Sequence, residues 1–336
     1  MVESTAREKC VGIVRGILPS PMYSGTRAIW LGLWSLGIAA QFGLPEVIIR
    51  FGHGLGIHGL GDDLLCTAVL RELRRRRKGE LWMISNHPEL FGCTGDADRV
   101  FPIDRVYDFF SKMWGREFRT MMVPSSPPNE LLSRHVIAEM CAVAGITGDV
   151  TLRPYLALDD SEAAAGAWAK GCVVVQSSGL GARYPLLLKE WYPERFNAVV
   201  DALRGQYEFI QIGSASDPPL AHARDLRGKS TIRGSAAILH HARLYIGLEG
   251  FLMHLARAID CPSVIIYGGH TGPWQTGYIC NKNLYSDLSC APCGRGTCDI
   301  GRKCMAEIQP EDVVVAVHDL LRKPRNPLME ETAFIG

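Results

Sequence analysis

The chain has 336 residues, a formal net charge of +1, and 47% hydrophobic against 21% charged residues. This composition is typical of a soluble globular protein and excludes a disordered or fibrous chain. The near-neutral charge excludes a global attraction to nucleic acid or to acidic membranes. Because the length exceeds one ordinary hydrophobic core, we expect two domains of roughly 150 residues each.

Residues 28–44 carry no charge and include Trp30 and Trp34. The segment is shorter than the roughly twenty apolar residues that a membrane span needs. A signal peptide is not indicated, because the preceding section is long and mixed in charge. We predict a helical extension over residues 1–45 that packs on the first domain or forms an oligomer contact. Peripheral membrane docking through the two tryptophans is the alternative.

The next segments alternate between strand and helix patterns. A short β-branched run at residues 46–51 ends in glycine and predicts a buried strand. A glycine-rich loop over 52–61 is followed by a helix over 62–77 with one apolar face, and then by a strand over 81–84. Strand, loop and helix in this order predict a parallel sheet with crossover helices.

Residues 71–78 are mostly basic. We interpret them as a solvated helix end rather than a binding patch, because cations complement the carboxyl-terminal end of a helix dipole. A Pro/Ser stretch at 124–128 predicts a surface loop, and a helix is expected over 131–144.

A hinge between the two halves is expected near residues 159–170, a polar and alanine-rich section. Strands are predicted over residues 172–176, 207–212, 244–246 and 263–267, and helices over 194–203, 235–242, 251–259 and 310–321. The alternation predicts an α/β fold of two doubly wound, Rossmann-like domains facing a cleft, with ligands at the carboxyl ends of the strands. The predicted domains cover residues 46–165 and 166–322, followed by a tail over 323–336.

Gly59 and Gly61 allow a sharp turn before the helix that begins with Asp62 and Asp63. Amide groups at a helix start favour an anion, but acidic residues there are also ordinary caps. The spacing is neither that of a Walker loop nor that of a dinucleotide fingerprint in its usual setting. An aspartate with a pKa raised by partial burial could accept a hydroxyl proton as a general base.

Four cysteines gather within residues 290–304: Cys290, Cys293, Cys298 and Cys304. Glycines between them allow the sulfurs to converge, and tetrahedral zinc or iron suits such a set. Disulfides and unligated thiols are the alternatives. The other cysteines lie singly in apolar segments, and the lack of a regular framework indicates a reducing compartment.

Residues 61–67, 189–193 and 247–254 together resemble glycosyltransferase family nine, the bacterial heptosyltransferases. The first segment is similar to the family's Gly-Asp turn, the second to its Lys-x-Trp-Pro segment, and the third to its Asp-Ser/Thr-Gly-x-x-His turn. The chain departs from the pattern where Tyr192 is inserted ahead of the proline. It departs again where Glu249, Gly250 and Phe251 replace the usual aspartate, hydroxyl residue and glycine, which affects donor identity.

The resemblance implies a GT-B fold, with the acceptor on the first domain and the nucleotide-sugar donor on the second. It implies that Asp62 is the catalytic base, while Asp63 caps the helix or faces solvent. The residues expected to bind the donor come from four loops or helix starts after the rear strands. They are Ser177, Ser178, Lys189, Glu249, Gly250, Phe251, His254, Gly268, Gly269 and His270.

By the same resemblance, the chain is an inverting glycosyltransferase that needs no catalytic cofactor and uses ADP-heptose as donor. The acceptor stays open among a glycan, a lipid-linked sugar, a protein and a small molecule. No nucleic-acid partner is expected, and the cytoplasm, including contact with the inner membrane, is the expected location. The alternatives are a nucleotide-sugar epimerase or hydrolase of the same fold, and a non-catalytic metal-binding scaffold or oligomer-forming protein.

Overall fold

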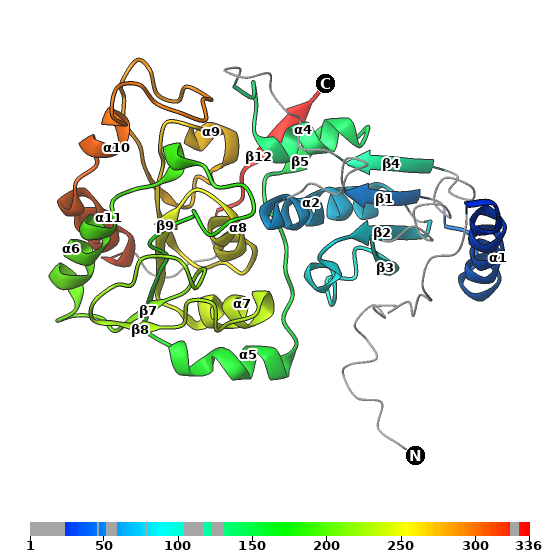
Figure 1. The fold of residues 1–336 in the computed structure, drawn as a ribbon, viewed down its shortest axis with the longest axis horizontal. Coiled ribbons are helices and arrows are strands. Elements are labelled where there is room, and N and C mark those ends of the chain that lie inside the picture. The colour runs from blue at the N-terminus through cyan, green and yellow to red at the C-terminus, as the bar shows by residue number, and fades with distance from the viewer. Residues whose placement is uncertain are drawn as a thin grey trace.

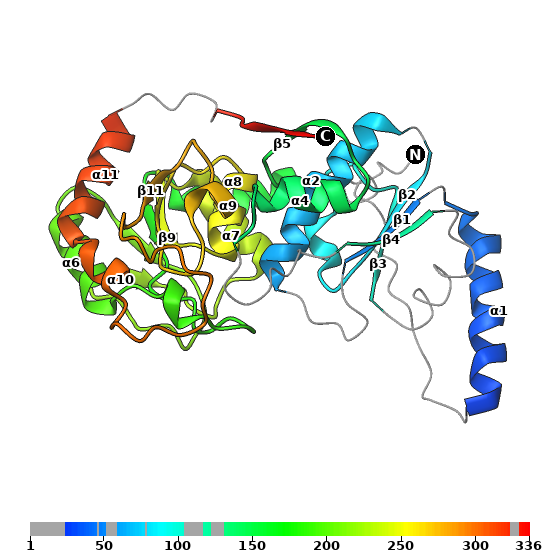
Figure 2. The same ribbon diagram turned by 90° about the horizontal axis from the view of Figure 1, so that it is seen from above.

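The computed structural model describes residues 24–45, 47–51, 59–77, 79–103, 117–121, 131–322 and 329–336. They form two parallel sheets, each covered by helices, that lie side by side along the long axis of the molecule (Figure 1). Seen from above, helix α1 (Ser24–Phe42) lies at the end of the molecule opposite α6 (Pro193–Leu203) and α11 (Pro310–Arg322) (Figure 2). The predicted α/β fold with two Rossmann-like sheets is confirmed. Residues 52–58 of the predicted loop at 52–61, the predicted loop at 124–128 and the Trp30 side chain lie outside the described residues.

The first sheet, with its helices, is called the front lobe. Its strands run parallel in the order β3-β2-β1-β4. They are β1 (Val47–Phe51), β2 (Leu81–Ser85), β3 (Arg99–Pro102) and β4 (Glu117–Met121). Its helices are α1, α2 (Leu60–Arg76), the 3-10 turn η2 (Pro88–Leu90) and α4 (Val136–Val143).

Alternating side chains divide the front sheet into two apolar faces, as the period of two in a strand requires. Ile48, Trp82 and Phe101 face α1 and pack around its Ile38. Val47, Ile49, Leu81, Met83 and Val100 face the other way, into the core that contains α2 and α4. Both faces are therefore buried, which explains why these strands read as continuous apolar runs.

Helix α1 packs one side on the front sheet and exposes apolar side chains on another, among them Leu33, with 62% of its surface exposed. In the part of the chain that the structure describes, no helix is long and apolar enough to cross a membrane.

The second sheet, with its helices, is called the rear lobe. All six strands run parallel in the order β11-β10-β9-β6-β7-β8. They are β6 (Val173–Val175), β7 (Phe209–Gln211), β8 (Ala223–Asp225), β9 (Leu244–Leu248), β10 (Ser263–Ile266) and β11 (Lys282–Leu284). This is the order of a nucleotide-binding doubly wound sheet, and the direction of winding reverses between β6 and β9. Ligands of such sheets bind outside the strand ends at that reversal.

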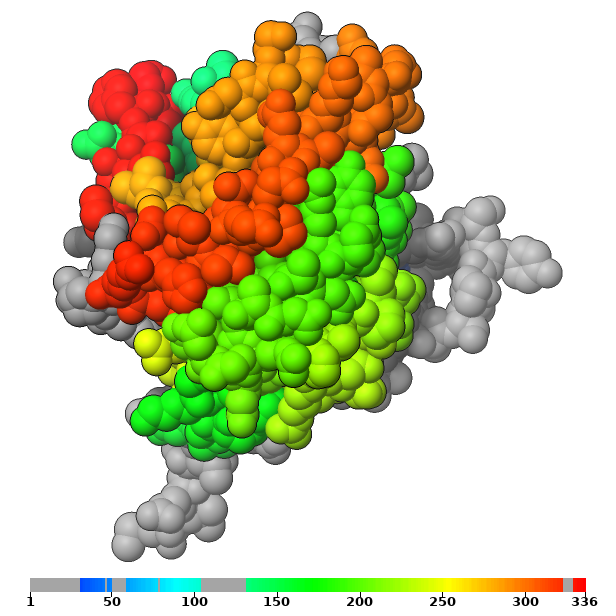
Figure 3. Space-filling view, turned by 90° about the vertical axis from the view of Figure 1, so that its left-hand side faces the viewer, coloured from blue at the N-terminus to red at the C-terminus, as the bar shows by residue number. Residues whose placement is uncertain are grey.

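Helices cover both faces of the rear sheet. α6 and α11 pack on one face through Phe196, Val200, Val313 and Val317. On the outer surface, α11 lies beside α6, with the segment around residues 270–300 above them (Figure 3). The other face packs on α7 (Ile232–His241) and α8 (Phe251–Ala258), which share one core with α2 and α4 of the front lobe. The remaining short helices are the 3-10 turn η4 (Leu187–Lys189), α9 (Pro273–Thr276) and α10 (Lys303–Glu307).

The section expected to be a hinge is helical. It forms α5 (Asp160–Gly166) and the 3-10 turn η3 (Ala167–Ala169). Asp159 caps α5 in a reciprocal capping box with Glu162, which satisfies two free amides at the helix start. Gly166 lies against α7 so closely that a Cβ would be 2.1 Å from the carbonyl oxygen of Ala237. The helix is favoured because alanines stand between a cap and a glycine, and the predicted position of the hinge stays a prediction.

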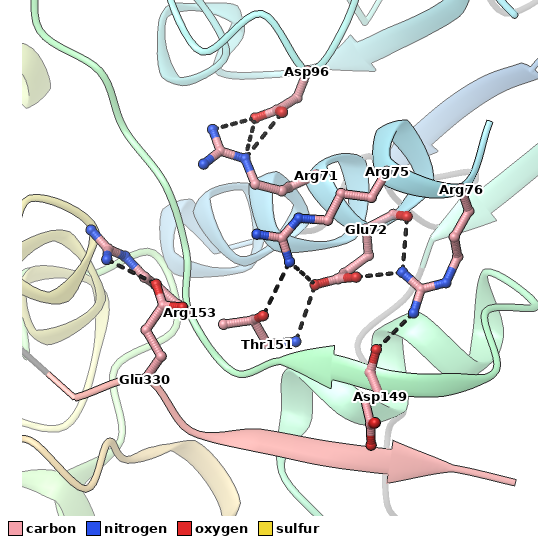
Figure 4. Close-up of polar contacts among 9 residues, drawn as sticks. All are labelled: Arg71, Glu72, Arg75, Arg76, Asp96, Asp149, Thr151, Arg153 and Glu330. Atoms are coloured by element: carbon pink, nitrogen blue, oxygen red, sulfur yellow. Dashed lines mark hydrogen bonds and ion pairs between the residues drawn. The ribbon is translucent and has the colours of Figure 1, made fainter. Parts of the chain in front are cut away.

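The chain crosses between the lobes twice. After β5 (Gly148–Thr151) it runs to α5, and after α11 it returns to β12 (Thr332–Ile335), which pairs antiparallel with β5. Arg153 joins the two crossings, because one guanidinium nitrogen lies 3.2 Å from Glu330 (Figure 4). Another lies 2.6 Å from Asp260 of the rear lobe.

The basic run at the end of α2 is paired with acidic and polar groups of the front lobe (Figure 4). Arg71 binds the Asp96 carboxylate through two nitrogens, at 2.9 and 3.1 Å. The buried Glu72 carboxylate accepts from Arg75 at 3.1 Å, from Arg76, and from the Thr151 amide at 3.1 Å. The contacts of Glu72 connect α2 to β5, so these charged side chains are paired within the front lobe.

The Glu72 network predicts a stability effect. In Glu72→Ala, two arginines and the Thr151 amide lose their shared acceptor, so the free energy of unfolding should fall by about 2–4 kcal/mol. Urea denaturation followed by circular dichroism measures it. The control is Asp201→Ala, which removes an exposed pair with Arg204 and should cause no resolvable change. Equal effects in both variants would contradict this role of Glu72.

Candidate functional site

The amino ends of α2 and α8 meet at the boundary between the lobes. A Cβ built on Gly61 would lie 3.6 Å from the Phe251 Cα and 3.6 Å from the His254 Cδ2. Asp62, the next residue of α2, therefore lies close to the turn between β9 and α8. That turn follows one of the two strands at the reversal of the rear sheet.

The Asp62 carboxylate is held by its own turn, since Oδ2 accepts a hydrogen bond of 3.0 Å from the Gly59 amide. Burial raises the pKa of Asp62 above its usual value, and the Glu249 charge adds to the increase. The Gly59 hydrogen bond and the Lys189 ammonium lower this pKa to a smaller extent. Asp62 of the front lobe is therefore within electrostatic reach of both Lys189 and Glu249 of the rear lobe.

Lys189 and Glu249 form an ion pair that joins η4 to the end of β9. Only 4% of the Glu249 side chain is exposed, against 25% of Lys189. Burial acts to raise the pKa of Glu249, but the net shift is downward, chiefly because of the charge and the hydrogen bond of the Lys189 ammonium. Glu249 is thus a buried carboxylate kept charged by Lys189.

The start of α8 depends on Gly250. Its φ of 153° and ψ of −162° fall in a region that residues with a side chain rarely adopt. This conformation accounts for glycine where the family pattern has a hydroxyl residue. Phe251 follows as the first residue of α8 and packs, half-buried, against the shared core.

His254 lies one turn into α8 and is buried. Its Nδ1 lies 2.6 Å from the Tyr278 hydroxyl, and burial lowers its pKa to about 3, so the ring is neutral. His135, which caps α4 of the front lobe, also packs on Tyr278, and its Nε2 lies 3.0 Å from the Gly277 carbonyl oxygen. His254 therefore belongs to a buried group that joins the two lobes.

Ser177 and Ser178 follow β6 at the same edge, but both hydroxyls are engaged within the protein. Ser177 donates to the Pro218 carbonyl oxygen at 2.7 Å and accepts from Gln211 at 2.8 Å. The Ser178 hydroxyl accepts from the Leu180 amide at 3.0 Å. Glu190 shapes the same loop by accepting from the Gly179 amide at 2.6 Å. Glu190 is not among the predicted site residues, although it lies next to Lys189.

Gly268, Gly269 and His270 follow β10 and lie against η4. A Cβ on Gly268 would be 1.8 Å from the Leu188 carbonyl oxygen, so only glycine fits there. The Gly269 amide donates to that oxygen at 3.0 Å. His270 Nδ1 lies 3.1 Å from the Arg295 carbonyl oxygen, and burial lowers its pKa. This loop supports the backbone around Lys189.

The cysteine segment lies next to the same loop. A Cβ on Gly269 would be 3.3 Å from the Cys304 sulfur and 3.6 Å from that of Cys293. Burial raises the pKa of the Cys304 thiol, and the nearby thiols of Cys290, Cys298 and Cys293 raise it further. Within the described ranges, however, no three His, Cys, Asp or Glu side chains are arranged as a metal-ligand set. The metal site stays a prediction.

Asp63 differs from its expected place, because it neither faces solvent nor caps α2. It is fully buried, and neither carboxylate oxygen has a hydrogen-bond partner of sound geometry among the described residues. Burial raises the pKa of Asp63 to about 7, despite the lowering effects of His87 and the Ser85 hydroxyl. The helix period alone could not show which of the two adjacent aspartates faces the core.

A pH-dependent stability follows from Asp63. Between about pH 4 and pH 7 the folded chain keeps a proton at Asp63 that the unfolded chain releases, so its contribution to stability is lost as pH rises toward 7. Asp63→Asn should raise the free energy of unfolding by roughly 1–3 kcal/mol at pH 8.5 and by much less at pH 5. Denaturation at both values measures this. The exposed control Asp299→Asn should show no such difference between the two pH values, and a pH-independent effect of Asp63→Asn would refute the assignment.

Comparison with known proteins supports the resemblance. Residues 151–303 match the model of glycosyltransferase family 9 (heptosyltransferase). Lipooligosaccharide heptosyltransferase 2 of Campylobacter jejuni is 31% identical over 104 residues, which cover 30% of this chain and 32% of the relative. Lipopolysaccharide heptosyltransferase 3 of Escherichia coli is 25% identical over 178 residues, or 46% and 52% of the two chains. The matches thus span about a third to a half of these relatives.

Solved structures show the same fold at low identity. Escherichia coli ADP-heptose lps heptosyltransferase II has a TM-score of 0.61 at 13% identity, covering 82% of this chain and 98% of the other. The family 9 glycosyltransferase of Veillonella parvula gives 0.63 at 14% identity, covering 82% and 97%. The iron-containing dodecameric glycosyltransferase TibC of Escherichia coli gives 0.60 at 16% identity, covering 83% and 76%. The chain is therefore a heptosyltransferase-like protein, with its match to glycosyltransferase family 9 over residues 151–303.

Proposed function

We propose that the chain is an inverting glycosyltransferase that moves a sugar from a nucleoside diphosphate to an acceptor hydroxyl. One observation carries the proposal: the amino end of α2, which carries Asp62, meets the start of α8, beside the ion pair of Glu249 and Lys189 from the rear lobe. The reaction needs a carboxylate to accept the proton of the acceptor hydroxyl and a cation to stabilise the departing diphosphate. Both groups are found here at the carboxyl edge of a doubly wound sheet. ADP-heptose is the proposed donor, because a protein of the same fold is an ADP-heptose heptosyltransferase.

In the proposed reaction, Asp62 accepts the proton of the acceptor hydroxyl. The oxygen attacks the anomeric carbon, the bond from that carbon to the diphosphate oxygen breaks on the opposite side, and the diphosphate departs with the bonding electrons. Lys189 and the free amides at the start of α8 stabilise its charge. The raised pKa of Asp62 makes its carboxylate a stronger base than an exposed aspartate.

The base assignment predicts a separation of turnover from donor binding. Asp62→Asn should lower kcat by about 10²–10⁴-fold, since general-base catalysis contributes that much, while the Kd for ADP changes little. Nucleotide release from ADP-heptose, with and without candidate acceptors, measures turnover, and calorimetry measures ADP binding. Asp63→Asn, which alters the adjacent carboxyl, is the control and should retain turnover. Near-normal turnover in Asp62→Asn would refute the base, and release that needs no acceptor would favour a hydrolase.

We also propose that Cys290, Cys293, Cys298 and Cys304 hold a structural zinc or iron ion. Two of the sulfurs lie against Gly269, and the other three thiols lie near enough to that of Cys304 to raise its pKa. Thiolate sets of this kind suit both metals, and the similarly folded TibC is iron-containing. The ion would stabilise residues 290–304 and takes no part in the proposed reaction.

The metal proposal predicts about one ion per chain in purified protein, measured by inductively coupled plasma mass spectrometry. Cys304→Ser should lose the ion, whereas Cys280→Ser, outside the cluster, should keep it. Protein with all four thiols free and no bound metal would contradict the proposal.

A further inference from the structure

The backbone on either side of Lys189 is held by side chains and amides from the cysteine segment and the loop after β10. One guanidinium nitrogen of Arg302 donates to the Glu190 carbonyl oxygen at 2.8 Å and to that of Leu187 at 3.3 Å. The Leu188 carbonyl oxygen accepts from the Gly269 amide at 3.0 Å. Three carbonyl groups around Lys189 are thus fixed from outside η4.

Arg302 is itself fixed by the cysteine segment. It adopts a left-handed conformation, with φ 51° and ψ 48°, at the residue before α10. Its amide donates to the Cys298 sulfur at 3.3 Å, and its carbonyl oxygen accepts from the Met305 amide at 2.9 Å. Its guanidinium also lies over the Tyr192 ring, 5.1 Å from the ring centre. The backbone of Arg302 is therefore held within the cysteine segment, while its side chain reaches the backbone around Lys189.

A lysine ammonium is a point charge on a long flexible side chain. Its position is therefore defined only when both the ammonium and the backbone of the lysine are held in place. Glu249 fixes the ammonium, and Arg302 with Gly269 fixes the backbone. Preorganisation of this kind raises affinity by lowering the ordering cost of binding.

We propose that Arg302 is a positioning residue for Lys189, through which the cysteine segment sets the affinity for the nucleoside diphosphate. The inference rests on the proposed function, because Lys189 must contact the diphosphate for its position to affect binding. Arg302 itself acts through the backbone of η4 and the adjoining Glu190.

The test uses the full chain and ADP as the probe, with calorimetry for Kd and binding stoichiometry. Arg302→Gln should weaken ADP binding by about 5–20-fold, the range of a lost charge-assisted hydrogen bond. Stoichiometry should stay near that of the original chain, and Arg302→Lys should recover part of the affinity. With ADP-heptose, KM should rise while kcat changes less than about threefold.

Arg295→Gln is the matched control, because it removes an equal charge from the same segment. The Arg295 side chain is 57% exposed, and its ion pair with Asp299 is long, at 4.0 Å. It should bind ADP like the original chain. An equal loss in Arg295→Gln would show an effect of net charge and overturn the proposal.

A double-mutant cycle separates positioning from other effects. Lys189→Met should itself weaken ADP binding by about tenfold or more, and Arg302→Gln should add little in that background. An undiminished Arg302 effect in Lys189→Met would overturn the proposal, as would wild-type affinity in Arg302→Gln. If Arg302→Gln does not fold, Arg302→Lys replaces it in the same cycle. Absence of ADP binding by the original chain would instead refute the proposed function.

Discussion

The two lobes come together where the amino ends of α2 and α8 approach, with Gly61 beside Phe251 and His254. A helix start carries a partial positive charge, so two such ends facing each other would repel. Asp62 and Glu249 place negative charge at this point and offset that repulsion. The same field favours an anion, which connects the packing of the lobes to the chemistry proposed at their boundary. The position of Asp62 relative to Lys189 follows from this contact.

Glu249 shows how a departure from a family pattern acquires a physical meaning. Glu249 stands where the family pattern has the shorter aspartate. Its carboxylate is almost fully buried and forms an ion pair with the Lys189 ammonium. Burying two charges costs desolvation free energy, which is offset only while each charge keeps a partner of opposite sign. A diphosphate bound at Lys189 would therefore replace, or share, an existing carboxylate partner. Under the proposed function, binding at this site would be an exchange of anions rather than the filling of an uncharged space.

Much of the rear lobe could be predicted from the sequence, because its buried strands and amphipathic helices carry strong local patterns. β9, β10, α6, α8 and α11 begin and end within a few residues of their predicted bounds. The short edge strands β8 and β11 and the pairing of β5 with β12 could not be predicted, because pairing partners distant in sequence leave no local pattern. The burial of Asp63 and the contacts of Arg302 depend on tertiary packing in the same way.

The return of β12 to the front lobe has a mechanical consequence. Arg153 joins the two connecting segments, because it bonds Glu330 ahead of β12 and Asp260 of the rear lobe. The lobes also share one hydrophobic core, built from α2 and α4 of the front lobe and α7 and α8 of the rear lobe. Separating the lobes would expose that core to water, so these contacts oppose any motion that would change the distance between Asp62 and Lys189.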